Sequence, residues 1–161
     1  MTTEHRSPAT RHTRRLCTLG ATIALAAAAA LTTTAGSAAA VTSSTPVGTW
    51  QGTAEHDGHK AAMTLSFDGA GKVCLWSDTS DGHGSWTPAG GNQFTFKADE
   101  RLHDAAGTTV GWVDVNQTAT LSGDKFASSG PSKVYDANHK YLSSTVANIA
   151  VARISATPRT C

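Results

Sequence analysis

The sequence is poor in charged and aromatic side chains and has no long apolar run. Charged residues make up 16% and aromatic residues 6% of its 161 residues. The longest apolar stretch, residues 19–31, has 13 residues and is shorter than the roughly 20 that a membrane-spanning helix needs. A chain of this length has room for one domain, which excludes a multidomain enzyme.

Basic and acidic side chains are almost equal in number, but they are distributed unequally between two parts of the sequence. Residues 1–40 carry four arginines and one glutamate, a net charge of +3, whereas residues 41–161 carry nine basic and eleven acidic side chains, a net charge of −2. The second part has no cluster of lysines and arginines. Because binding to phosphates needs a concentrated basic face, we expect no nucleic-acid partner.

Residues 1–40 have the order of a secretory signal peptide. Arg14-Arg15 precede the apolar run, and Ala38-Ala39-Ala40 forms a small-x-small cleavage site that would leave Val41 as the first mature residue. A lipoprotein cysteine would have to follow the apolar run, and Cys17 precedes it. The sequence therefore predicts a secreted, extracellular protein of bacterial type, with no membrane association once the signal is removed. Both the general and the twin-arginine export routes stay open.

Only three cysteines are present, and export would remove Cys17 with the signal. Cys74 and Cys161 would then remain in an oxidising compartment, where we expect them to form a disulfide. Two free thiols are the alternative. Two cysteines are too few for a structural zinc site unless histidines complete it, and we predict no cofactor.

The mature chain consists of short β-type runs between turns rich in Gly, Asp and Asn, without helical periodicity. After a polar lead-in at 41–46, the predicted strands are 47–55, 61–67, 72–77, 83–88, 92–103, 108–122, 125–135 and 140–154. We expect an all-β fold in which eight antiparallel strands form an up-and-down meander closed into a small barrel over 47–154, followed by a tail at 155–161. A β-sandwich is the alternative. Gly130-Pro131 predicts a bulge in the seventh strand, because proline cannot donate to a central ladder.

Three turns repeat one pattern, with Asp first and a left-handed position fourth: 68–71, 104–107 and 136–139. The aspartate can accept hydrogen bonds from backbone N–H groups within the turn, which predicts hairpin connections. In the third turn His139 stands where the others have glycine. This is strained unless Asn138 takes the left-handed conformation instead.

Gly48-Thr49-Trp50 opens the first strand, and Arg153 lies near the end of the last. This pair resembles the signature of the calycin superfamily, which includes lipocalins, fatty-acid-binding proteins and avidins. The resemblance implies that Trp50 closes one end of the barrel and that Arg153 packs across its ring in a cation–π contact.

The hairpin at 104–107 predicts which side chains point into the barrel. If position i pairs with position 211 − i, Phe94, Phe96 and Glu100 face inward, with Gly111 opposite Glu100. A buried carboxylate is costly unless it is paired, hydrogen-bonded or protonated, so Glu100 is a candidate acid/base or ligand-orienting group. The alternative is that Glu100 reaches water at the rim or pairs with a nearby Arg or Lys.

The meander places all histidines of the mature chain at one end of the barrel. They are His56, His59, His83, His103 and His139. Such a rim could bind a divalent transition metal or change charge with pH, whereas the alternative is simply that loops are polar.

The favoured hypothesis is a secreted, non-enzymatic barrel that binds a small, partly apolar molecule, with Glu100, Phe94, Phe96 and Trp50 as ligand contacts. Two other hypotheses stay open. One is an isomerase or cyclase that uses Glu100 as acid/base, and the other is a protein-interaction or inhibitor module with a filled core. No Gly-x-Ser-x-Gly motif, phosphate loop or zinc-protease helix is present.

Overall fold

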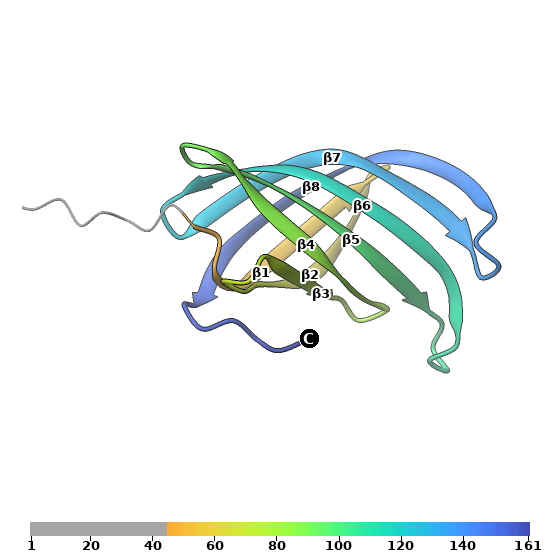
Figure 1. Cartoon of the computed structure of the whole chain (residues 1–161). Coiled ribbons are helices and arrows are strands. Elements are labelled where there is room, and N and C mark those ends of the chain that lie inside the picture. The colour runs from red at the N-terminus through yellow and green to blue at the C-terminus, as the bar shows by residue number, and fades with distance from the viewer. Residues whose placement is uncertain (1–44) are drawn as a thin grey trace, which may run out of the picture. The chain divides into compact units, whose positions relative to one another are not determined.

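The computed structural model describes residues 45–161, and the predicted signal peptide at 1–40 lies outside the described residues (Figure 1). The described chain folds into eight antiparallel strands and contains no helix that could cross a membrane. The strands are β1 (Gly48–His56), β2 (His59–Phe67), β3 (Lys72–Trp76), β4 (Ser80–Gly90), β5 (Gln93–His103), β6 (Thr109–Ser122), β7 (Lys125–Asp136) and β8 (Tyr141–Ser155).

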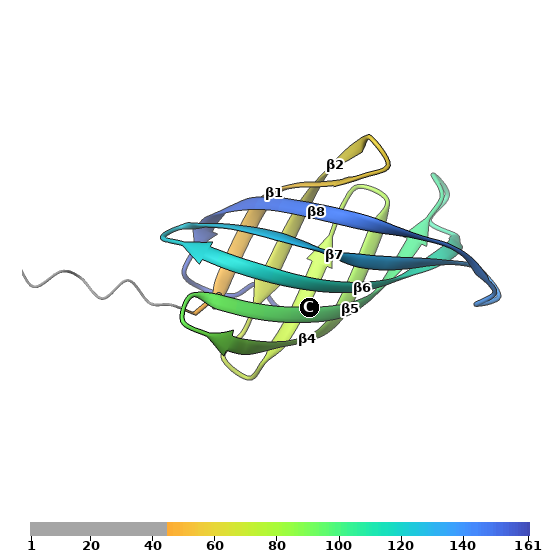
Figure 2. The same ribbon diagram turned by 90° about the horizontal axis from the view of Figure 1, so that it is seen from above.

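The sheet is a closed barrel, as predicted, and not a sandwich. Each strand pairs with the next along the chain, and β1 pairs with β8 from Trp50↔Arg153 to Glu55↔Asn148. Figure 2 shows the strands following one another around the barrel. Closure leaves no free strand edge in the sheet, which removes the edge that an open meander would expose.

In the three repeated turns the first aspartate binds backbone N–H groups as predicted. In each one the Oδ1 atom of the first aspartate (Asp68, Asp104 or Asp136) accepts two backbone N–H bonds of 2.8 to 2.9 Å. The left-handed residue of the third turn is His139, with φ of 60°, and not Asn138. The His139 ring stacks on Trp112 with ring centroids 4.7 Å apart, which offsets part of the cost of this conformation.

The predicted pairing of β5 with β6 was wrong by two residues, although the inward face was right. Glu100 lies opposite Val113, and Gly111 lies opposite Leu102. Asp104 N–H donates to Thr108 O, so the loop is one residue longer than expected, and a bulge next to Leu102 adds a second shift. Two shifts of one residue restore the alternation, so the same side chains still point inward.

The bulge predicted at Gly130-Pro131 is absent. The β6–β7 register is the same on both sides of it, from Val115↔Ser132 to Thr118↔Ser129. A Cβ atom on residue 130 would lie 2.0 Å from Asn116 O, so glycine lets the two strands approach without an extra residue.

One end of the barrel is filled by aromatic side chains. Phe67 makes edge-to-face contacts with Phe94, Phe96 and Phe126 at centroid distances of 5.4 to 5.9 Å. Trp50 is fully buried beside Phe126, and its Nε1 donates to Pro46 O over 2.7 Å. We call this packed region the closed end.

The Arg153 guanidinium lies 4.1 Å from the centre of the Trp50 ring, so the cation–π contact implied by the sequence resemblance is present. Arg153 also donates to Val47 O and to the Asp124 carboxylate, which fixes the chain that enters β1. These bonds hold the guanidinium over the end of the barrel.

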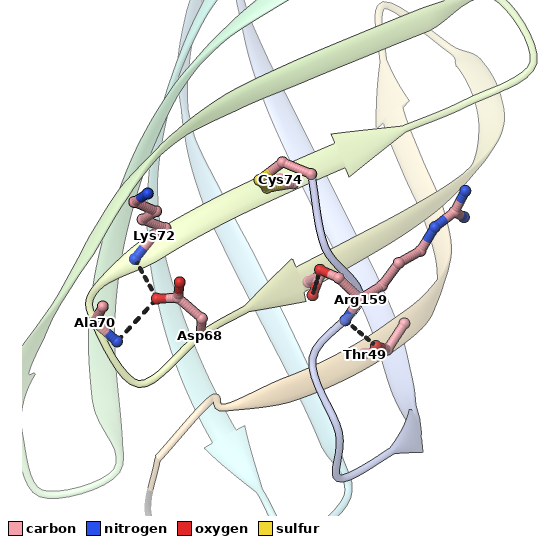
Figure 3. The surroundings of a disulfide bond; sticks show 8 residues. Thr49, Asp68, Ala70, Lys72, Cys74 and Arg159 are labelled. Atoms are coloured by element: carbon pink, nitrogen blue, oxygen red, sulfur yellow. Dashed lines mark hydrogen bonds between the residues drawn. A yellow bond between two sulfur atoms is a disulfide. The ribbon is translucent and has the colours of Figure 1, made fainter.

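Cys74 and Cys161 form the predicted disulfide (Figure 3). The tail before Cys161 lies on the outer face of β1 to β3. There Thr49 Oγ1 donates to Thr157 O and Ser66 Oγ donates to Arg159 O, both over 2.8 Å. The disulfide and these hydrogen bonds tie the end of the chain to three strands.

Candidate functional site

The other end of the barrel, which we call the open end, holds a cavity of about 250 Å³. The aromatic filling stops at Phe96, which lines the cavity and also contacts Phe67. Beyond Phe96 several inward positions carry small side chains, including Ala54 and Ala147, so the interior is not filled. The polar side chains in the wall are His56, Ser77, Thr79, Ser80, Glu100, Ser132 and Thr145.

Glu100 is the one acidic side chain in the wall of this cavity. It is carried by β5 between Gly82 of β4 and Val113 of β6. Ser80 Oγ donates a hydrogen bond to Glu100 Oε1. Burial raises the pKa of the Glu100 carboxyl, and this effect outweighs the bond from Ser80 and the influence of His56, which both lower it.

A chain of donors leads to Glu100. Thr79 N–H donates to Ser77 Oγ over 3.2 Å, and the hydroxyl oxygens of Ser77 and Ser80 lie 2.6 Å apart. Because Ser80 uses its single hydroxyl proton on Glu100, Ser77 must be the donor to Ser80. Every donor in the chain therefore points towards the carboxyl, which favours its ionised form.

Arg101, the residue next to Glu100, forms an ion pair with Asp81 and not with Glu100. Its Nη2 lies 2.9 Å from Asp81 Oδ2, and His103 Nε2 contacts the other oxygen of the same carboxylate. The bonds from His103 and Arg101 hold the pKa of Asp81 below its ordinary value. Among residues 45–161 Glu100 forms no ion pair with lysine or arginine, which contradicts the alternative in which it pairs with one of them.

The predicted ligand contacts divide between the two ends. Glu100 and Phe96 line the cavity, whereas Phe94 and Trp50 are buried in the closed end and are not part of its wall.

The five histidines do not gather into one site. His56 and His59 face each other at the β1–β2 turn with ring centroids 6.2 Å apart, and His83 is exposed on the outside of β4. His103 binds Asp81, and His139 stacks on Trp112. In the described part of the chain no group of three His, Cys, Asp or Glu side chains is placed to hold a metal ion.

Ser80 was missed at the level of the sequence because β4 begins at Ser80 and not at residue 83. Ser77 was assigned to the end of the strand at 72–77, whereas β3 ends at Trp76. The run Asp78-Thr79-Ser80-Asp81-Gly82 has the composition of a turn. A Cβ atom on Gly82 would lie 2.8 Å from Glu100 Cα, so this glycine belongs to a strand that is pressed against β5. The period-2 spacing of Gly82, Gly84 and Trp86 is the signal that could have revealed the longer strand.

Comparisons with known proteins do not identify the chain. No protein-family model matches it, and neither the curated proteins nor the solved structures include a match. The fold and the cavity therefore carry the functional argument.

Proposed function

We propose that the mature chain is a secreted binding protein of calycin type that holds one small molecule in the cavity at the open end. The observation that carries this proposal is a cavity of about 250 Å³ at the open end, whose wall is mainly apolar and contains a single carboxyl group. Binding sites for small molecules commonly combine an apolar wall with a few placed polar groups. Glu100 would orient the ligand, and Phe96 would contact its apolar part.

The volume limits the size of the ligand. A water molecule, with one non-hydrogen atom, takes about 30 Å³ in the liquid, so a cavity of about 250 Å³ has room for roughly eight non-hydrogen atoms. This is less than the volume of sites for drug-sized molecules. The ligand we propose is therefore smaller than a drug-sized molecule.

Native mass spectrometry of protein recovered from culture medium tests the proposal. We expect a species heavier than the polypeptide that loses a small molecule on denaturation. The variant Ala147→Phe places a large ring in the cavity and should abolish the extra mass, whereas Ala150→Phe, on the outer face of the same strand, should keep it. A wild-type protein without bound molecule that also binds no compound of up to roughly eight non-hydrogen atoms would contradict the proposal.

A second candidate function is acid–base catalysis by an isomerase or cyclase, favoured by the raised pKa of Glu100 and by the donor chain through Ser80 and Ser77. Glu100 would remove a proton from a bound substrate and return it at another atom. Glu100→Gln should then abolish turnover and keep substrate binding. An NMR titration in which Glu100 ionises at the unperturbed value of about 4.3 would exclude this role.

A further inference from the structure

We infer that the cavity selects small organic amines, with the ammonium group of the ligand paired to Glu100 and its apolar body against Phe96. The inference rests on the proposed function, because it names the ligand class of the same cavity.

The first argument is the balance of charge in the wall. Glu100 is its one acid, and no lysine or arginine of the described chain lines the cavity. Glu100 is partly buried, and a carboxylate in such a place without a counter-charge is costly, since part of its attraction to water is lost. An ammonium group brought by the ligand would supply the missing charge, whereas an anionic ligand would add to the cost.

The second argument is the direction of the hydrogen bonds. Ser80 donates to Glu100 and Ser77 donates to Ser80, so the chain is arranged for a carboxylate that accepts. A ligand carbonyl would require Glu100 to be protonated, and Ser80 has no second proton to offer it. A ligand that donates fits the site as it stands. A protonated amine donates and carries charge, so it forms the stronger bond.

The third argument is the charge around the mouth. Asp81 of β4 lies outside the wall, is paired with Arg101 and His103, and raises the pKa of Glu100. Asp57 of the β1–β2 turn accepts a 2.8 Å hydrogen bond from Thr145 Oγ1. His56 of β1 is the other titratable group in the wall, and its Nδ1 lies 3.9 Å from Asp57 Oδ2. The neighbours of Glu100 on β6, β7 and β8 in the wall are uncharged: Val113, Val115, Ser132, Val134, Thr145, Ala147 and Ile149.

The ionisation of Glu100 predicts how ligand binding depends on pH. At low pH Glu100 is protonated and offers no counter-charge to an ammonium group. Amine affinity should therefore rise as pH increases through the ionisation of Glu100, until the amine itself loses its proton. A neutral ligand of the same shape should bind with little dependence on pH.

Isothermal titration calorimetry with three compounds of nearly equal shape tests the inference: cyclohexylmethylamine, cyclohexylmethanol and cyclohexanecarboxylate. At pH 8 we expect the amine to bind at least tenfold more tightly than the alcohol and the carboxylate to bind least. We also expect the amine affinity to fall between pH 8 and pH 5, and the alcohol affinity to stay nearly constant. These measurements use the wild-type protein, so they do not depend on the folding of a variant.

Glu100→Gln provides the second readout, and Glu55→Gln is the matched control because it makes the same change on the exposed side of β1. Glu100→Gln should lower amine affinity at least tenfold and change alcohol affinity less than threefold, whereas Glu55→Gln should change neither. If the alcohol binds as tightly as the amine, the inference is overturned and the proposed function stands. If none of the three compounds binds, the amine inference fails, and the broader search for ligands then decides the proposed function.

Discussion

The closed and open ends of the barrel are built from the same eight strands but put inward-facing positions to opposite use. At the closed end these positions carry Trp50, Phe67, Phe94 and Phe126, which fill the interior and contact one another. At the open end they carry alanines, valines and hydroxyl side chains around a cavity and one carboxyl group. We infer from this difference that the closed end stabilises the fold, so that the open end is free to bind a ligand.

Truncation of one side chain at each end should break this comparison most clearly. Trp50→Ala removes a fully buried ring together with its contacts to Phe126 and Arg153, so we expect a loss of about 3 to 5 kcal/mol in the free energy of unfolding. Val134→Ala, in the cavity wall, should cost less than about 1.5 kcal/mol because its neighbours on the cavity side are already missing. Urea denaturation measures both, and equal losses would contradict the division into two ends.

The disulfide should support stability without affecting binding. Replacing both Cys74 and Cys161 by serine removes a link between residues separated by 87 positions, and we expect a loss of about 2 to 4 kcal/mol. The bond lies on the outer face of β3, so the affinity for a cavity ligand should stay within threefold of the wild type. A parallel measurement of unfolding and binding checks both parts, and a variant that is stable but binds no ligand would connect the tail to the site.

Glu100→Gln should raise stability at neutral pH, by about 1 kcal/mol in the ligand-free protein, because the wild type holds a charge in a partly buried place there. Burial raises the pKa of Glu100 from 4.5. Below pH 4.5 Glu100 is protonated, and its contribution to the stability of the wild type is fully present. This contribution is lost as pH rises through the folded-state pKa of Glu100. Thermal unfolding should be measured from pH 3.5 to pH 8. The unfolding temperature of the variant should exceed that of the wild type by an amount that grows as pH rises above about 4.5. Parallel curves would mean that Glu100 is not buried.

Asp81→Asn should have a smaller effect of the opposite sign. The bonds from His103 and Arg101 lower the pKa of Asp81 from 3.8, so its contribution is present above pH 3.8 and is lost as pH falls through the folded-state value. The Asp81 and Arg101 side chains are 40% and 45% exposed, which limits the expected loss at neutral pH to about 0.5 to 1 kcal/mol. Chemical denaturation at pH 7 and pH 3 provides the test. A variant less stable than wild type by the same amount at both values would assign the effect to packing.

Much of the fold could be predicted from the sequence because its signals are local. Alternating side chains and turns that begin with aspartate mark the hairpins, and two remaining cysteines leave one pairing. The errors came from non-local contacts. The β5–β6 pairing depends on a bulge beside Leu102, and the absence of a bulge at Pro131 depends on how closely Gly130 approaches β6.

The candidate site was predictable only in part. Alternation along β5 placed Glu100 inside the barrel, but it could not show that Ser80 donates to it, since Ser80 lies in a stretch with the composition of a turn. Alternation also placed Phe94 and Phe96 on one inward face. Which of the two borders a cavity depends on side chains from other strands, such as Phe67 and Ala147, and no local pattern contains that information.

The most direct test of the two-ended barrel is a methyl NMR titration of the wild-type protein with cyclohexylmethylamine and cyclohexylmethanol. We predict that the methyl signals of Val113, Val134 and Ile149 in the cavity wall shift with saturation, while those of Val73 and Leu121, which are buried outside that wall, do not. Saturable shifts confined to exposed residues such as Val146 and Ile154, with none in the cavity wall, would contradict a ligand site at the open end.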